Sequence, residues 1–244
     1  MKILVKIFIL FCLLLGAVAS VMATSSDSTF NRRRSTTLFG FEVGLTNTNL
    51  YGTQLDLQLK TPGSSYQSKT GIQLGFIYKH EFVNFFYLKT GLSYVQKKGY
   101  VTGSGFLPEN KIEADFITIP LIVGLQLVSG SNVNKVKLAI EGGISNSTIQ
   151  NGGDNFESGL YPGQKISRTT MIQSLIIGAN LEIDISNKLA CFVNYRYSKD
   201  LNYYFWRRYS YNVGNKIEYK DYDVWIQNTS LTFGLLFNLN NAKK

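Results

Sequence analysis

The chain has 244 residues, a formal net charge of +9 and 44% hydrophobic residues, with 15 Tyr and 16 Phe among them. Charged residues make up 17%, below the roughly 25% of an average soluble domain, and this composition excludes intrinsic disorder, collagen and coiled coil. A single His and two Cys exclude a zinc or iron–sulfur site, which needs about four such ligands, so we expect neither a metal nor a cofactor.

The first 23 residues have the pattern of a secretory signal peptide. Lys2 and Lys6 precede an apolar run over residues 7–15, which is shorter than the about 20 residues that a spanning helix needs. We therefore predict a cleaved signal peptide over residues 1–23, with an uncleaved N-terminal anchor as the alternative. Cleavage leaves Cys191 as the only cysteine, so the exported chain folds without an internal disulfide.

Residues 24–37 are rich in Ser and Thr and contain three consecutive arginines, Arg32 to Arg34. They show no apolar period, which predicts a flexible basic tail on the periplasmic side. The arginines either contact anionic lipid headgroups or are simply solvated.

From Leu38 onward apolar and polar residues alternate with a period of two, the signature of half-buried strands. Several of these stretches exceed the mean soluble strand of about 5–6 residues and suit a transmembrane strand, which needs about 9–11. The eight blocks are 38–46, 70–79, 85–97, 112–127, 135–147, 170–184, 189–199 and 225–239.

The connections between the blocks alternate between long and short. The long ones are 47–69, 98–111, 149–169 and 200–224, and short ones lie around 80–84, 128–134 and 185–188. Long extracellular loops and short periplasmic turns are typical of outer-membrane barrels. The sequence therefore predicts an all-β fold, an eight-stranded antiparallel up-and-down transmembrane β-barrel over residues 38–239, followed by a polar C-terminal tail, 240–244.

The polar face of the blocks carries charges of both signs in mid-strand, whereas the apolar face carries almost none. A Lys or Arg facing lipid at the bilayer midplane costs roughly 2–4 kcal/mol, so we expect these charges to face the lumen. There they would pair with one another and fill the lumen, which excludes a diffusion pore. The predicted lumen network consists of Glu42, Gln73, Lys89, Glu141, Glu182 and Arg196. The alternative is that some of these side chains lie near a rim and are hydrated.

A second interpretation of the same alternation stays open. A secreted or periplasmic lipocalin-like barrel also has eight antiparallel strands, but its apolar face points inward to bind a small apolar ligand.

Several segments in order resemble the PorT-like outer-membrane β-barrel family, small barrels of Bacteroidetes-type bacteria. They are Phe41-Glu-Val-Gly-Leu45, Leu88-Lys-Thr-Gly-Leu-Ser-Tyr-Val-Gln-Lys-Lys-Gly99, Ile119-Pro-Leu-Ile122, Glu141-Gly-Gly143, Val193-Asn-Tyr-Arg-Tyr197 and Ser230-Leu-Thr-Phe-Gly-Leu235.

The resemblance implies a porin-like barrel fold in the bacterial outer membrane and a tolerated bulge at Pro120. It also implies the barrel-assembly machinery as a partner during biogenesis. Members often end on an aromatic residue that this machinery reads, whereas here Phe237 is internal. An accessory role in secretion or transport across the outer membrane, known for the namesake, is a further alternative.

No residue set suggests catalysis, and we expect a non-enzymatic protein. His80 stands beside Glu81 without a suitably placed Ser, which favours a surface histidine, and Cys191 lies on the apolar face.

The best candidate for surface contacts is Trp206, Arg207, Arg208 and Tyr209, since arginines among aromatics suit lipopolysaccharide phosphates or an extracellular protein partner. The alternative for this segment is a hairpin that only extends the barrel. The positive charge is dispersed, which argues against nucleic-acid binding. The sequence thus favours a structural or surface-interaction role in the outer membrane.

Overall fold

The computed structural model describes residues 35–52, 65–83, 85–102, 110–129, 135–154, 165–168, 170–213 and 216–238. The predicted signal peptide, residues 24–34 of the predicted tail and the C-terminal tail lie outside these ranges. Every regular element within them is a β-strand, and they contain no helix long and apolar enough to cross a membrane. The strands are β1 (Thr36–Tyr51), β2 (Ser65–Val83), β3 (Phe86–Thr102), β4 (Asn110–Ser129), β5 (Val136–Asp154), β6 (Lys165–Arg168), β7 (Met171–Asp184), β8 (Leu189–Asp200), β9 (Phe205–Val213) and β10 (Lys216–Asn238).

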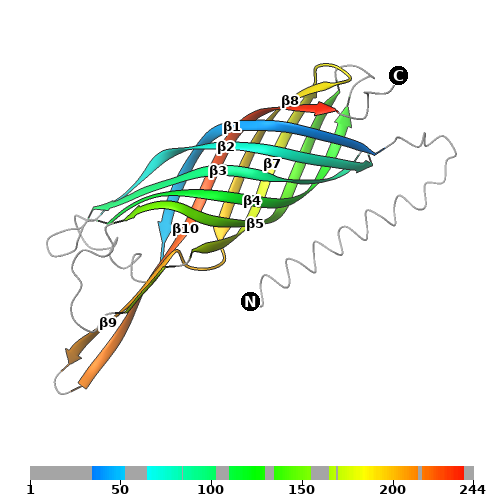
Figure 1. The fold of residues 1–244 in the computed structure, drawn as a ribbon. Helices are drawn as coiled ribbons and strands as arrows, with labels where there is room; N and C mark the ends of the chain where they lie inside the picture. The colour runs from blue at the N-terminus through cyan, green and yellow to red at the C-terminus, as the bar shows by residue number, and fades with distance from the viewer. Residues whose placement is uncertain are drawn as a thin grey trace, which may run out of the picture. The chain divides into compact units, whose positions relative to one another are not determined.

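Eight of these strands form a closed antiparallel barrel. The order is β1-β2-β3-β4-β5-β7-β8-β10, and β10 pairs back with β1, with Leu38 opposite Asn238 and Tyr51 opposite Trp225 (Figure 1). Each strand follows its neighbour in sequence apart from the insertions β6 and β9, so the eight-stranded up-and-down prediction is confirmed. Thr36 and Thr37, which the sequence placed in the tail, already belong to β1.

The two ends of the barrel differ. The near end, as we define it, is where β1 begins and β10 ends, and it also holds the connections between β2 and β3, β4 and β5, and β7 and β8. The other end is the far end. There the predicted connection 200–224 is largely a hairpin, because β9 pairs with the first part of β10 and β6 pairs with β9. Figure 1 shows β9 and this part of β10 continuing beyond the barrel wall.

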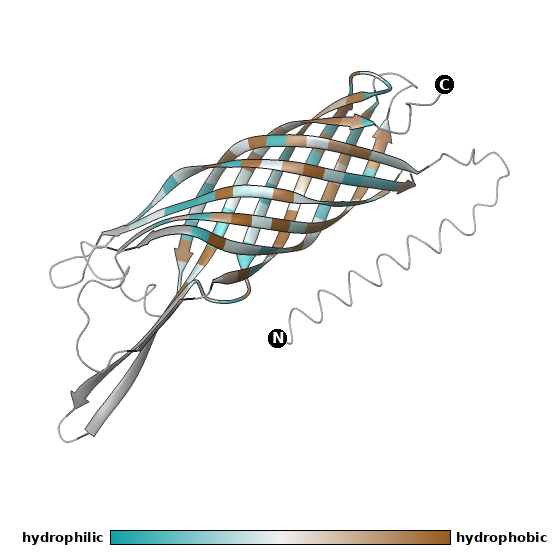
Figure 2. Cartoon of the chain, viewed as in Figure 1, coloured by the Kyte–Doolittle hydropathy of each residue, from teal (hydrophilic) through white to brown (hydrophobic). Residues whose placement is uncertain are grey.

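Because side chains alternate along each strand, successive residues face either the outer wall or the lumen of the barrel. On β1, Phe41, Val43 and Leu45 are more than half exposed on the outer wall, whereas Glu42 and Thr46 are buried inside. Figure 2 shows the same alternation of apolar and polar residues along the other barrel strands. A register slip of one residue would exchange the two faces on a strand, so this contrast fixes the register.

Glycines on the inner face make room for aromatic rings. Tyr87 lies opposite Gly124, and Phe192 lies opposite Gly234. A Cβ atom added at Gly124 would collide with the Tyr87 ring, and one at Gly234 would collide with the Phe192 ring. The close approach of ring to backbone is therefore possible because these two positions lack a side chain.

Pro120 does not produce the bulge that the sequence predicted. The β3–β4 ladder pairs Thr90 with Leu121 and Ser93 with Thr118, so the register is the same on both sides of the proline. The ladder is interrupted between these pairs because proline has no N–H to donate. The Pro120 carbonyl instead accepts a hydrogen bond of 2.7 Å from the Thr90 hydroxyl.

Candidate functional site

The near end of the lumen holds two lysines that share acidic partners, beside a buried apolar cluster of Leu38, Ile77, Ala190, Phe192 and Leu236. Lys79 Nζ lies 2.7 Å from Glu182 and 2.8 Å from Glu81, and Lys137 Nζ lies 2.7 Å and 3.1 Å from the same two carboxylates. Glu182 is fully buried. Lys137 also lies 3.3 Å from Asp184. These contacts connect β2, β5 and β7 across the lumen, so the cluster holds strands that are not all neighbours in the sheet.

A second cluster lies in the middle of the barrel around Glu141. Its Oε1 accepts hydrogen bonds from the Lys89 ammonium and, at 2.6 Å, from the Tyr87 hydroxyl. Its Oε2 accepts a bond of 2.7 Å from Asn194 Nδ2. The buried carboxylate of β5 is thus satisfied by donors from β3 and β8, which a buried charge requires.

Arg196 of β8 joins this cluster to a neighbouring one. Its Nη1 and Nη2 each lie 3.1 Å from the Glu42 carboxylate, in the two-pronged geometry that makes such pairs strong, and its Nε lies 3.5 Å from Glu141 Oε2. Gln73 Nε2 donates a further bond of 2.7 Å to Glu42 Oε1. A single guanidinium therefore links β1 to β5 through the lumen.

Closer to the far end the lumen holds a sparser polar layer. Lys97 Nζ lies 3.5 Å from Asp200 Oδ1, which also accepts a bond of 2.7 Å from the Ser174 hydroxyl. The Thr48 hydroxyl donates to Asn228 Oδ1 at 3.1 Å.

An apolar cluster follows this layer, and we call it the plug. It consists of the buried residues Leu50, Ala114, Phe116, Ile172, Tyr204, Val224 and Ile226. Tyr204 is not in a strand. Its N–H donates to the Val224 carbonyl at 2.8 Å, and Leu201 N–H donates to the Gln173 carbonyl at 2.7 Å. The segment between β8 and β9 is thereby fixed so that Tyr204 packs among the other plug residues.

Tyr66 packs against the plug from β2. Its hydroxyl donates to the Thr48 carbonyl.

All six residues of the predicted lumen network are buried and face the interior. The structure brings Glu42, Gln73, Lys89, Glu141 and Arg196 together, but it places Glu182 with Lys79 and Lys137 instead. Sequence reasoning missed Lys79, Lys137, Lys97 and Asp200 as network members. Lys137 was visible on the polar face of its block, and its partner Glu182 lies directly opposite on the neighbouring strand, but its second partner Glu81 could not be known without the way in which the barrel closes.

Of the remaining predicted positions, the side chains of His80 and Cys191 lie in the described part of the structure. His80 Nδ1 lies 3.0 Å from the Thr37 hydroxyl at the near end, and its ring packs edge-on against Phe82. Cys191 is a free, partly exposed thiol. In the described ranges, no group of three or more His, Cys, Asp or Glu residues is placed to hold a metal ion. The backbone of Trp206, Arg207, Arg208 and Tyr209 lies in β9, but their side chains lie outside the described part of the structure.

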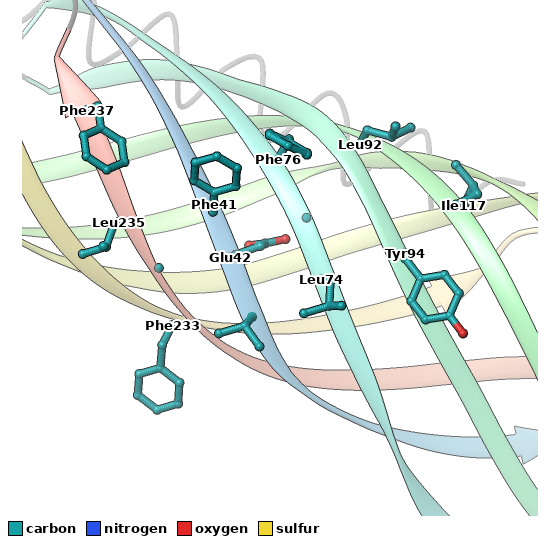
Figure 3. Close-up of a pocket in the computed structure, with 13 residues that line it drawn as sticks. Phe41, Glu42, Leu74, Phe76, Leu92, Tyr94, Ile117, Phe233, Leu235 and Phe237 are labelled. Carbon is teal, nitrogen blue, oxygen red and sulfur yellow. The ribbon is translucent and has the colours of Figure 1, made fainter.

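The outer wall of the barrel is apolar, whereas the lumen holds the charged side chains. A groove of about 580 Å³ lies on this wall, lined by Phe41, Leu74, Phe76, Phe233 and Leu235 among others, which are drawn in Figure 3. Large apolar residues with 36–77% exposure occur on every barrel strand. Together they make the outer wall of the barrel largely apolar, and we call this set of residues the belt.

Aromatic pairs lie at both ends of the belt. At the far end, Trp225 stacks on Tyr51 with ring centroids 6.1 Å apart and contacts Tyr203 edge-on at 6.4 Å. Lys199 Nζ lies 5.0 Å from the centroid of the Tyr51 ring. At the near end, the rings of Phe82 and Phe86 are 5.5 Å apart.

No family model matches the chain, and no curated protein matches it. Among solved structures it is similar to the outer membrane protein OprG from Pseudomonas aeruginosa, with 15% identity over 83% of this chain and 95% of OprG, and a TM-score of 0.45. It is also similar to a major outer membrane protein from Thermus thermophilus, with 13% identity over 83% and 99% of the two chains and a TM-score of 0.47. A third likeness is to the outer membrane protein AlkL in DMPC lipid bilayers, with 14% identity over 91% and 99% and a TM-score of 0.41. At these identities and TM-scores the likenesses assign no function to the chain.

Proposed function

We propose that this chain is a non-enzymatic β-barrel of the bacterial outer membrane with a structural or surface-interaction role and a lumen closed to diffusion. The observation that carries the proposal is the belt. Soluble proteins rarely expose a contiguous apolar patch larger than a few hundred Å², whereas here apolar side chains surround the barrel and the charges are buried inside it. An apolar surface around a charged interior is the reverse of a soluble protein, and it suits a lipid environment.

The backbone supports the same environment. In hydrocarbon every backbone N–H and C=O has to be paired within the protein, and a closed barrel achieves this because it has no edge. The pairing of β1 with β10 provides that closure. The aromatic pairs at the two ends of the belt are where the interfacial girdles of a membrane barrel lie.

The orientation follows from the connections. We propose that the near end faces the periplasm, after export through a cleaved signal peptide, and that the far end faces outward. The partners would be outer-membrane lipid and lipopolysaccharide, with the assembly machinery recognising the end of β10, where Phe237 is 42% exposed on the outer wall.

Burial of the five acidic and basic residues of the predicted network disfavours a lipocalin-like calyx for an apolar ligand, because such a ligand would leave those charges without water or new partners. The ionic clusters, the polar layer and the plug fill the lumen, which also argues against a diffusion pore.

A matched pair of variants tests the membrane assignment. Val43→Arg puts a charge in the middle of the belt, where it costs roughly 2–4 kcal/mol in lipid, whereas Asn49→Arg lies on the same face of β1 at the far edge of the belt, close to the aromatic residue Tyr51, and costs roughly 0–1. We expect V43R to fold into lipid vesicles much less well than N49R, measured by the heat-dependent shift of the folded band on a detergent gel. Equal folding of the two variants, or wild-type protein that stays in the soluble fraction of cells without such a shift, would refute the proposal.

The closed lumen has a separate test. Large and stable conductance of the pure protein in planar bilayers would refute it.

A second candidate role is an accessory function in secretion, which the resemblance to the PorT-like family suggests. The β9–β10 hairpin would present Trp206, Arg207, Arg208 and Tyr209 to lipopolysaccharide or to a protein partner. Replacing Arg207 and Arg208 together by Ala should weaken the binding of purified lipopolysaccharide if the hairpin recognises phosphate, and Asn49→Ala on the barrel wall serves as the control. Unchanged binding would remove this contact from the proposal, and unchanged secretion in a strain that lacks the protein would remove the accessory role.

A further inference from the structure

The groove on the outer wall extends over five strands. It has a volume of about 580 Å³ and is lined by residues of β10, β1, β2, β3 and β4, most of them apolar. Its lining residues closest to the far end are Leu74 on β2 and Tyr94 on β3, which lie opposite each other in the ladder (Figure 3). The same two strands continue from there toward the far end.

Two lysines lie on these strands beyond the groove. Lys69 of β2 and Lys98 of β3 are directly opposite each other in the ladder. Lys98 faces outward, since its neighbours Lys97 and Gly99 are buried. Lys69 is exposed on the same face, and its Nζ lies 5.7 Å from the centroid of the Tyr100 ring. Opposite residues have Cβ atoms about 4.5–5.5 Å apart, and like charges at such positions destabilise a sheet.

A β-bulge brings Lys69 to this face. The β2–β3 register shifts between Lys69 and Gln73, where residues 70–72 stand against 96 and 97. Gln73 is buried in the lumen, so strict alternation without the extra residue would turn Lys69 to the lumen too. Bulges re-aim side chains in this way. The two like charges thus meet on the outer wall because of a local irregularity.

The surroundings do not neutralise the lysine pair. On the side of Lys69, the outward residues of β1 are the exposed amides Asn47 and Asn49. On the side of Lys98, Glu113 of β4 lies opposite in the ladder. One carboxylate therefore accompanies two ammonium groups, and in the described ranges neither lysine forms an ion pair. The patch keeps a positive charge that a bound anion would complement.

We propose that the groove and the lysine pair together bind one phosphorylated glycolipid of the lipid A type. An acyl chain lies in the groove, and a phosphate lies between the ammonium groups of Lys69 and Lys98, where its charge relieves their repulsion. Tyr94 and Lys98 are about 13 Å apart along the strand, or about 10 Å along the bilayer normal for a tilted strand, so one lipid reaches both. The inference rests on the proposed membrane function, with the far end outward, because only then does the lipid lie with its phosphate toward the surface.

Binding to the full chain, folded in a non-ionic detergent, tests the site. The probes are lipid A with both phosphates, the same lipid after enzymatic removal of its phosphates, and the deacylated headgroup, and native mass spectrometry counts the bound molecules. We expect the dephosphorylated lipid to bind roughly 25-fold more weakly, at about fivefold for each lysine. Equal binding of the dephosphorylated lipid would overturn the phosphate contact, and equal binding of the deacylated headgroup would overturn the role of the groove.

The matched variants are Lys69→Gln with Lys98→Gln, and Lys135→Gln with Lys188→Gln, which removes the same charge at the near end. The affinity for lipid A should fall by roughly 25-fold in K69Q/K98Q and stay at the wild-type value in K135Q/K188Q. Equal losses would assign the binding to general electrostatic attraction and overturn the proposal. Displacement of the lipid by equimolar inorganic phosphate would also overturn it, since the site would then take free phosphate.

Stability measurements separate binding from a structural role of the lysines. Without lipid A, removal of the opposed charges should leave the urea midpoint of K69Q/K98Q unchanged or raise it, whereas added lipid A should raise the midpoint of the wild type more. A lower midpoint of the variant in both conditions would mean that the lysines stabilise the barrel itself, against the proposal. Absence of the heat-dependent shift in the wild type would instead count against the proposed membrane function.

Discussion

From the near end to the level of Arg196 the lumen holds most of the ion pairs, beside a small apolar cluster of Leu38, Ile77, Ala190, Phe192 and Leu236, whereas from Phe116 to Tyr204 it is filled by apolar side chains. The ion pairs are directional, and Lys79–Glu182, Lys89–Glu141 and Arg196–Glu42 join strands that are not neighbours in the sheet. The plug is held by contact area and has no such preference for partners. The first region is thus suited to specifying one arrangement of strands, and the second to excluding water.

Substitutions in the two regions should also destabilise the barrel by different mechanisms. Removing one partner of a buried pair leaves an uncompensated charge, whereas trimming an apolar side chain leaves a cavity. Variants in each region can therefore test whether the division of roles is real.

The largest effect should come from Glu141→Ala, which removes the acceptor of Lys89, Tyr87 and Asn194. We expect a loss of about 3–5 kcal/mol in the free energy of unfolding, because the Lys89 ammonium is left buried without its counter-charge. Urea titration of the folded band on a detergent gel measures the loss. The double variant Lys89→Met with Glu141→Leu should recover much of it, and a double variant as unstable as E141A would contradict the role assigned to the pair.

Ile172→Ala tests the plug, in which Ile172 is fully buried. The free energy of unfolding should fall by about 2–5 kcal/mol through lost packing, and the far end should admit water. The entry of water is measured as faster reaction of a small polar thiol reagent with a Ser174→Cys side chain, in a background where Cys191 is replaced by Ala. Met171→Ala is the control, since Met171 is the next residue and is 55% exposed on the outer wall. If both variants label at the same rate, the plug is not the seal.

Gly124→Ala probes the aromatic ring beside the ionic region and should have the smallest effect. The new methyl group would collide with Tyr87, which donates to Glu141, so we expect a loss of about 1–3 kcal/mol in the free energy of unfolding. Gly142→Ala is the matched control, because a Cβ there has no atom within 4 Å. The same urea titration should separate the two, and a G142A loss as large as that of G124A would point to strand propensity rather than to the ring.

The strands and their inner and outer faces could be predicted because the alternation of apolar and polar residues can be read within a few consecutive residues. Phe41, Glu42 and Val43 reveal two environments within three residues. The ends of strands were less predictable: β1 continues through Asn47, Thr48 and Asn49, where both faces are polar and the contrast vanishes. The β9–β10 hairpin was assigned to a connection for the same reason.

The candidate site was predictable in its composition but not in its pairs. Lys79 meets Glu182 across 103 residues of sequence, and Arg196 meets Glu42 across 154. Which charges meet depends on the tilt and stagger of the closed barrel, and these properties belong to no single strand. Tyr204 lies outside any alternating block, so its place in the plug left no mark in the sequence.

The seam between β1 and β10 determines when the molecule can be completed. Leu38 and Asn238 come from opposite ends of the described chain, so their pairing requires almost the whole polypeptide to have been made (Figure 1). Until then the sheet has two open edges, each with unpaired backbone groups that invite pairing with other chains. Contacts of such large sequence separation also form slowly. A nascent or truncated chain is therefore exposed to aggregation for longer than a protein built from local contacts, and chaperoning up to the last strand becomes a requirement of this architecture.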